Sequence, residues 1–176
     1  MKKDDTPEYM KQLSGKVLEI NFKSQSLKMS FFATEDICHS NGTIIQGGFT
    51  TVMMDSCMAF LVMELTDFVY TPMSIDINVS FLAAGRPGKL DCKSKIIKLG
   101  KSIGFASAEL HQEGEIIATA SSSLKLVKIE GSQKDFLKDN IAKDKAQTWK
   151  TFNKLTIYTI IFIAIILAII FTLFSY

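Results

Sequence analysis

Residues 46–68 read QGGFTTVMMDSCMAFLVMELTDF, and this stretch decides the fold. The part from 48 to 68 is long enough for a helix and is rich in methionine and leucine. Apolar side chains cover nearly every face of that helix, so we expect it to be buried rather than to lie on a surface. The sequence therefore predicts one long central helix.

Strand patterns flank this helix on both sides. Before it, residues 16–34 predict two strands around a polar turn, followed by a loop rich in turn-forming residues, ICHSNGTIIQGG. After it, residues 73–82 alternate apolar and polar side chains with period two. Three more strands are expected at 89–98, 103–111 and 115–128. The short connections favour an antiparallel sheet with the helix on one face, which is an α+β fold.

The C-terminal segment has a different composition. Residues 155–176 contain no charged residue, and this length is enough to cross the hydrocarbon core of a bilayer. Basic residues indicate the cytoplasmic side of a span, and aromatic residues indicate its interface. Four lysines and a tryptophan precede the segment, and a tyrosine lies near its start: Lys143, Lys145, Trp149, Lys150, Lys154 and Tyr158. We expect a single C-terminal transmembrane helix, with a cytoplasmic domain at 15–130 joined to it by a polar linker at 131–154.

Charge and cysteine content exclude several classes of protein. The net charge is +2, and the dispersed lysines give no nucleic-acid footprint. Three cysteines without a CxxC pair argue against a disulfide framework. Two histidines far apart in the sequence offer no metal-ligand cluster, and the polar segment 1–14 lacks the apolar region of a signal peptide. We therefore expect a protein of the reducing cytoplasm without metal or cofactor.

Two glycines, Gly47 and Gly48, meet the start of the predicted helix. Backbone N–H groups there lack intrahelical partners and attract negative charge. Glycine also lets a ligand approach the backbone closely. A carbonyl oxygen that develops negative charge during hydrolysis needs donors of this kind. A glycine turn that only caps the helix is the alternative interpretation.

Asp55 is the one Asp, Glu, Lys or Arg residue between Asp36 and Glu64. Burial of an unpaired carboxylate is unfavourable, so this side chain must be paired, exposed to a cleft or functional. A structural aspartate bonded to a neighbouring strand is the alternative. Gly47 and Asp55 lie about 12 Å apart along one helix axis, so both cannot reach one carbonyl from the same chain. Two such helices running antiparallel across a two-fold axis could form the site together, which predicts a homodimer with an interface site.

The order of elements and four segments together resemble the hotdog-fold acyl-CoA thioesterases of the phenylacetate-degradation (PaaI-like) type. The segments are HSNGTIIQGGFTTVMMD, SIDINVSFLAAGRPGKL, KLGKSIGFASAEL and GEIIATASSSLKLV, and the resemblance covers residues 15–128. In that family an Asn and a Gly precede His-Gly-Gly, and an Asp follows eight residues after the first of those glycines. The resemblance implies a hotdog fold, an antiparallel sheet wrapped around one long buried helix, and a dimer or a dimer of dimers.

The resemblance also implies roles for individual residues. The Gly47 N–H would form the oxyanion hole, Asp55 would be the general base or nucleophile, and Ser74 would help to hold the attacking water. Gln46 stands where the family usually has His, and it can also donate a hydrogen bond. Asn41, next to Ser40, is the candidate for the family's Asn.

The nucleotide half of coenzyme A would meet the loops around Arg86 and Lys101, because a basic side chain can pair with phosphate. The residues implied to bind substrate or coenzyme A are Gly48, Arg86, Gly100, Lys101 and Ser102. His39, in the loop before the helix, is either a substrate contact or an ordinary loop residue.

We therefore expect a membrane-tethered acyl-CoA thioesterase. A second hypothesis is a non-catalytic hotdog module that binds acyl-CoA or serves as a scaffold at the membrane. A third is a dehydratase acting on hydroxyacyl thioesters, which would use a His with an acid. No His lies within the predicted helix or at the Gln-Gly-Gly site, and this disfavours the dehydratase.

Overall fold

The computed structural model describes residues 8–129 and 156 of the 176-residue chain. The linker predicted at 131–154 and, Thr156 apart, the transmembrane helix predicted at 155–176 lie outside the described residues. Within the described part, one helix, α2 (Gly47–Leu65), has the length and apolar composition of a membrane span. Its side chains belong to the hydrophobic core of the domain.

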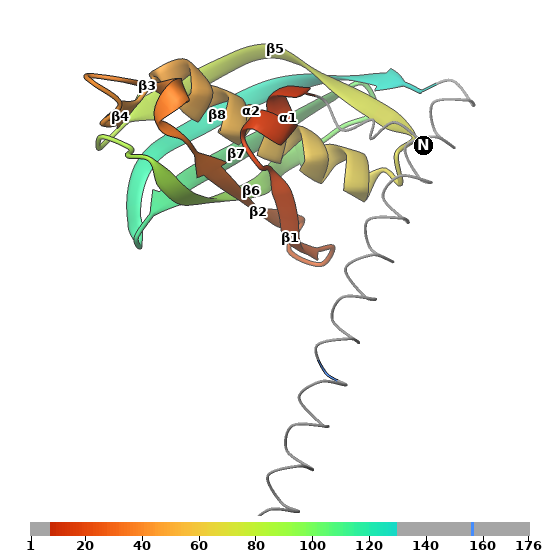
Figure 1. The fold of residues 1–176 in the computed structure, drawn as a ribbon. Helices are drawn as coiled ribbons and strands as arrows, with labels where there is room; N and C mark the ends of the chain where they lie inside the picture. The colour runs from red at the N-terminus through yellow and green to blue at the C-terminus, as the bar shows by residue number, and fades with distance from the viewer. Residues whose placement is uncertain (1–7, 130–155, 157–176) are drawn as a thin grey trace, which may run out of the picture. The chain divides into compact units, whose positions relative to one another are not determined.

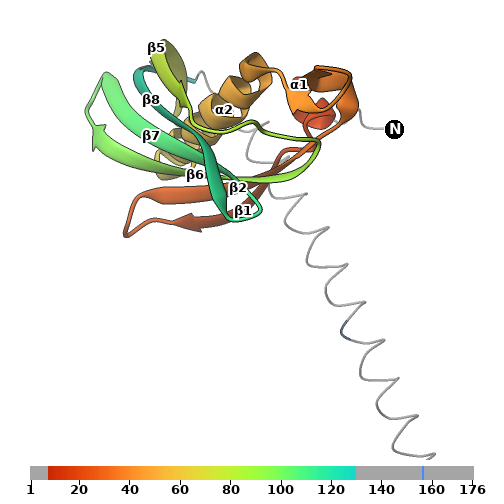
Figure 2. The same ribbon diagram turned by 90° about the vertical axis from the view of Figure 1, so that its left-hand side faces the viewer.

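A six-stranded sheet forms the main layer of the domain, with strand order β1-β2-β6-β7-β8-β5 and every neighbouring pair antiparallel. Figures 1 and 2 show the sheet curving around α2. The strands are β1 (Lys16–Asn21), β2 (Ser26–Ala33), β5 (Tyr70–Phe81), β6 (Gly88–Leu99), β7 (Ile103–Gln112) and β8 (Glu115–Lys128). The predicted antiparallel sheet with a long helix on one face is confirmed.

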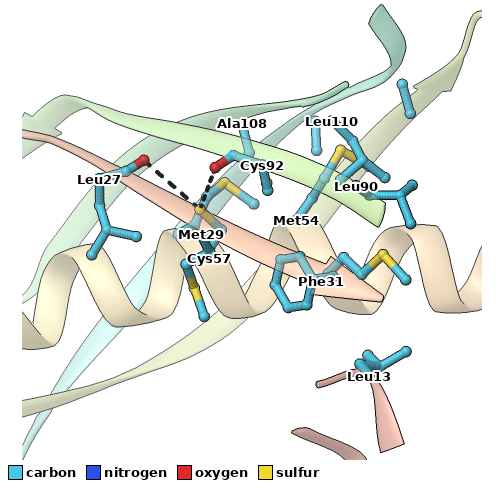
Figure 3. Packing of buried hydrophobic residues seen from close by; sticks show 14 of the residues in the cluster. Leu13, Leu27, Met29, Phe31, Met54, Cys57, Leu90, Cys92, Ala108 and Leu110 are labelled. Carbon is cyan, nitrogen blue, oxygen red and sulfur yellow. Dashed lines mark hydrogen bonds between the residues drawn. The ribbon is translucent and has the colours of Figure 1, made fainter. Parts of the chain in front are cut away.

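The core lies between α2 and the inner face of the sheet. Along most of β6 and β7, every second residue is buried, so one face of the sheet packs on the helix. Figure 3 shows side chains of α2, β2 and β6 packed together in this core. The helix contributes side chains with no exposed surface, namely Met53, Met54, Cys57, Met58, Leu61 and Val62. Each such burial stabilises the fold by about 1.5–3 kcal/mol for a large apolar side chain.

The buried thiols form part of this core. Cys57 Sγ lies 3.3 Å from Ser94 Oγ and 3.6 Å from the Cys92 carbonyl oxygen (Figure 3 shows the latter contact). The hydrogen bond from Cys57, together with burial, holds the pKa of Cys92 well above its usual value. A thiol that stays protonated is a poor nucleophile, so Cys92 serves packing rather than chemistry.

Several short elements were not predicted from the sequence. They are α1 (Glu8–Gln12), the 3-10 helix η1 (Glu35–Ile37), and a two-stranded ribbon of β3 (Cys38–His39) and β4 (Ile44–Ile45). Met10 in α1 and Leu13 just after it are 3% and 1% exposed and join the core. A five-residue helix is too short to show a period, so its contribution to the core is visible only in three dimensions.

The boundaries of the main elements differ slightly from the predicted ones. Helix α2 starts one residue earlier than predicted and ends at Leu65 rather than 68. Strand β5 starts at Tyr70, although the strand pattern was placed after Pro72. Proline has no N–H to give to a ladder and is tolerated in edge strands. Because β5 lies at the edge of the sheet and pairs only with β8, Pro72 is accommodated within it.

Candidate active site

The start of α2 is fixed by its capping residues. Gln46 has extended backbone angles, φ −66° and ψ 130°, and is the N-cap of the helix. The Gly48 N–H donates to Gln46 Oε1 at 2.6 Å. Thr51 Oγ1 donates to the Gly47 carbonyl oxygen at 2.9 Å, one turn further on. In this structure the side-chain oxygen of Gln46 is therefore a hydrogen-bond acceptor. The family resemblance implied that Gln46 donates a hydrogen bond, and its side-chain nitrogen can still do so.

Gly47 is the first residue of α2, and its N–H has no acceptor among the described residues. A Cβ atom at this position would lie 3.0 Å from Cζ of Phe81. The ring of Phe81, at the end of β5, thus lies so close to the backbone of Gly47 that a side chain at position 47 would crowd it. The unpaired amide predicted from the sequence is present, and the close approach explains a glycine there.

A cavity of about 220 Å³ lies beside this helix start. Besides Gly47 its lining includes His39, Thr50 and Phe81. His39 Nδ1 is 2.8 Å from Ser40 Oγ. The structure thus brings His39 to the same cavity as Gly47, while Thr50 and Phe81 are lining residues that sequence reasoning missed. Asp55 is not among the described residues that line this cavity.

Asp55 lies further along α2 and is half-buried. Ser74 Oγ donates a hydrogen bond to Asp55 Oδ1 at 2.6 Å. The structure therefore joins two residues that the sequence resemblance had assigned to catalysis. It also agrees with the alternative in which the carboxylate is bonded to a neighbouring strand.

A β-bulge in β5 directs Ser74 towards the helix. The register of β5 against β8 shifts between Ser74 and Asp76, which makes Ile75 an additional residue. Ser74 pairs with the fully buried Leu124 and so faces α2, whereas simple alternation grouped it with the outward-facing polar residues. Bulges re-aim side chains and are frequent next to active sites. The alternation of apolar and polar residues in the sequence cannot predict a bulge that reverses which side chains face the helix.

Asn41 lies in the turn between β3 and β4, two residues after His39. It is exposed and adopts a positive φ of 58°, between Ser40 at 53° and Gly42 at 78°. Asparagine and glycine tolerate this left-handed region better than most residues. Within the described residues no contact joins Asn41 to the carboxylate of Asp55 or to the cavity beside Gly47.

The residues implied to bind coenzyme A are divided between two ends of the molecule. Arg86 precedes β6, and its Nη1 is 3.4 Å from the Thr43 carbonyl oxygen. The Gly100–Ser102 turn follows the same 12-residue strand. At about 3.3 Å per residue the strand between them is at most roughly 40 Å long, and the two groups are at its opposite ends, so one protomer does not direct both at one phosphate. The N–H of Gly48 is already bonded to Gln46.

Comparison with known proteins bears on this arrangement. Residues 42–118 match the family model of the thioesterase superfamily, and this range includes Gly47, Asp55 and Ser74. A search of curated proteins found no relative of the chain. Within the described residues, no group of three His, Cys, Asp or Glu side chains is placed to hold a metal ion.

Solved structures are similar to the whole described domain. A phenylacetic acid degradation-related protein from Ralstonia eutropha JMP134 is 25% identical, with a TM-score of 0.65 over 69% of this chain and 91% of its own. The E. coli PaaI protein of the phenylacetic acid degradation operon is 14% identical, with a TM-score of 0.62 over 70% of this chain and 86% of its own. A thioesterase from Haemophilus influenzae is 14% identical, with a TM-score of 0.62 over 69% and 84%. The described domain thus has the hotdog fold of the thioesterase superfamily, with PaaI-like structural neighbours.

Proposed function

We propose that this domain hydrolyses acyl-CoA thioesters to a free acid and coenzyme A. The fold and its thioesterase neighbours support a thioester hydrolase. The observation that carries the proposal is the 2.6 Å hydrogen bond that Ser74 donates to Asp55. Asp55 is the one acidic residue in the first four turns of the apolar helix α2. A carboxylate held next to a hydroxyl can bind and deprotonate a water molecule.

The proposed reaction uses a base and an oxyanion site. Asp55 takes a proton from a water molecule held by Ser74, and the water oxygen attacks the thioester carbonyl carbon. Negative charge then develops on the carbonyl oxygen, which the Gly47 N–H and the positive end of the α2 dipole stabilise. The carbon–sulfur bond breaks, and the leaving thiolate receives the proton from Asp55. Direct attack by the Asp55 carboxylate is the alternative route, and it requires the same free carboxylate.

We further propose that each site is shared by two protomers. Gly47 and Asp55 are on the same helix about 12 Å apart along its axis, and the cavity beside Gly47 is not lined by Asp55. The 12-residue strand β5 lies at the edge of the sheet, where its free backbone groups can pair with a second copy. A two-fold axis there would bring the Gly47 of one chain towards the Asp55 of its partner. The same pairing is needed for Arg86 and Lys101 to approach one nucleotide.

The proposal includes membrane tethering through residues 155–176, with the domain on the cytoplasmic side. Its support is the uncharged sequence of that segment and the lysines that precede it. Tethering would concentrate the enzyme where acyl-CoA with long chains partitions.

Replacing Ser74 by alanine is expected to lower kcat about 10- to 100-fold with little change in KM, because a hydrogen bond to a charged group contributes about 1.5–3 kcal/mol. Steady-state hydrolysis of acyl-CoA by the full chain in detergent would measure this. Ser80→Ala is the matched control, since Ser80 is an exposed residue of the same strand that pairs with Thr119 on the outer side. Equal losses in both variants would remove Ser74 from the mechanism.

A fragment that ends at Gly131 is expected to be soluble, folded and active. All six strands of the sheet and α2 lie within the compact unit Met1–Gly131. Circular dichroism and the same hydrolysis assay would test the fragment against the full chain in detergent. An unfolded fragment beside an active full chain would show that the domain needs sequence beyond residue 131.

The test of the proposed function is a screen of the full chain against acyl-CoA thioesters of different chain length and head group, with release of the free thiol as readout. Hydrolysis of at least one thioester that depends on Asp55 is the expected result. Binding of acyl-CoA without any release of thiol would instead establish a non-catalytic binding module.

A further inference from the structure

We propose that the outer face of the sheet docks onto an anionic membrane surface. Five apolar side chains on this face, which we call the outer patch, are 38–65% exposed: Met73, Ile97, Ile103, Phe105 and Val127. Scattered exposed apolar residues are ordinary, but a contiguous group marks an interaction site. The outer patch is contiguous, as the strand register shows.

The register places these residues on neighbouring strands near one end of the sheet. Lys125 of β8 pairs with Ile103 of β7 on one side and with Met73 of β5 on the other. Phe105 of β7 pairs with Lys98 of β6. Ile97 is the additional residue at the β6 bulge between Ile96 and Lys98. Val127 follows Lys125 by two positions, so it lies on the same face of β8.

Lysines are interspersed with the outer patch. Lys95, Lys98 and Lys125 are exposed, and among the described residues none of them forms an ion pair. The acidic residues of this face do not cancel them. Asp91 is paired with Lys28 and Lys89, and Glu109 is opposite Lys93. Two further acidic residues lie on this face: Glu19, opposite Lys28, is on β1, which carries no patch residue, and Asp76 is opposite Ser123 on β5. On the patch strands, Lys95, Lys98 and Lys125 are thus accompanied by Asp76 as the one carboxylate without a basic residue opposite it.

Apolar side chains interspersed with lysines are the chemistry that binds an interface of anionic lipids. The apolar groups enter the headgroup region, and each nearby lysine adds electrostatic attraction. The chain also leaves β8 beside the patch, since Lys128 is the last residue of the strand and the apolar segment 155–176 follows in the sequence. A membrane is therefore the occupant that both the charge and the course of the chain favour. Helix α2 lies on the opposite face of the sheet (Figure 2), so docking would leave Asp55 and Gly47 turned away from the bilayer.

The test uses the full chain with a reporter on the patch. An environment-sensitive fluorophore is attached at Phe105→Cys, or at Ile103→Cys as a second position, in a Cys38→Ser background; the other two cysteines are buried. Phe32→Cys is the matched control, because Phe32 is 50% exposed and lies on the outer face of β2, opposite Lys89. The labelled chains are reconstituted in phosphatidylcholine vesicles with or without about 30% phosphatidylserine.

With phosphatidylserine, labels at 105 and 103 should shift to shorter emission wavelength and be quenched by spin-labelled lipids, while the label at 32 should not. About 0.5 M salt should reverse the effect, because screening shortens the range of the attraction. Lys98→Gln/Lys125→Gln should reduce the ratio of docked to free label about 30-fold, since each lysine near the surface contributes about a factor of five. Lys16→Gln/Lys89→Gln should leave the ratio unchanged, because these lysines are opposite Ser30 and Phe32, at the other end of β2 from the patch.

Three results would overturn docking onto anionic lipid. Labels at 105 and 103 that stay as water-exposed as the label at 32 would show that the patch does not contact the bilayer. Equal protection with and without phosphatidylserine would remove the role of the lysines. Protection already present in detergent that grows with protein concentration would identify a second copy of the chain as the occupant.

Discussion

Replacing Asp55 by asparagine is expected to lower kcat at least about a hundredfold while KM changes little, because loss of a general base costs about 10²–10⁴ in rate. Asparagine has nearly the same shape, and its side-chain oxygen can still accept the hydrogen bond that Ser74 donates to Asp55 Oδ1. The geometry of the site is therefore retained while the proton acceptor is lost. Release of free thiol from acyl-CoA by the full chain measures the effect.

The matched control is Asp76→Asn, the same chemical change two positions beyond Ser74. Asp76 is exposed and pairs with Ser123 on the outer side of the sheet, past the bulge. Its variant should hydrolyse acyl-CoA at the normal rate. The thermal midpoint of Asp55→Asn should stay equal or rise, because a carboxylate retained for chemistry in an apolar helix lowers stability. Normal turnover in Asp55→Asn would leave Asp55 with a structural role and favour a binding module.

The sheet and the central helix could be predicted because their patterns are long and regular. Apolar side chains cover nearly every face of the 19-residue helix, and β6 to β8 are ten or more residues long and alternate along most of their length. Patterns of this length survive in the structure because a whole face of the sheet must be buried. The five-residue α1 and the two-residue strands β3 and β4 offer no such period.

The sequence predicted which residues belong to the candidate site but not how they are placed in space. The sequence and its family resemblance singled out Gly47, Asp55 and Ser74. The sequence did not show that Ser74 faces the helix, because the additional residue Ile75 reverses the alternation of β5. The approach of Phe81 to Gly47 is likewise a contact between distant elements, for which no local signal exists.

Mixing two inactive variants, Asp55→Asn and Gly47→Pro, is expected to restore about a quarter of wild-type activity. If each site joins Gly47 of one chain to Asp55 of the other, a mixed dimer has one site with both groups intact and one that lacks both. Random re-pairing makes about half of the dimers mixed, and half of their sites work. If both groups acted within one chain, every site in the mixture would lack one of them.

The structure shows why proline is a suitable replacement at position 47. Gly47 is the first helical residue after the N-cap Gln46, a position that proline favours because its missing N–H is unpaired there anyway. Gln46 has ψ of 130°, within the extended region that a residue before proline adopts. The added Cβ would lie 3.0 Å from Cζ of Phe81, so the ring of this 57% exposed side chain has to shift by a few tenths of an ångström. Proline thus removes the proposed oxyanion donor while the helix start is kept.

The decisive control tests whether recovered activity comes from shared sites or merely from mixing two proteins. Asp55→Asn is combined with the double variant Gly47→Pro/Asp55→Asn, so that every site in every dimer lacks the carboxylate and activity stays near zero. Circular dichroism must show that Gly47→Pro is folded, and co-purification of two differently tagged chains must show that subunits exchange. With both conditions met, a quarter of the activity in the first mixture and none in the control would require the oxyanion donor and the base to come from different chains. No recovery in the first mixture would instead mean that the 12 Å separation along α2 is not bridged by a partner, and the shared-site model would be wrong.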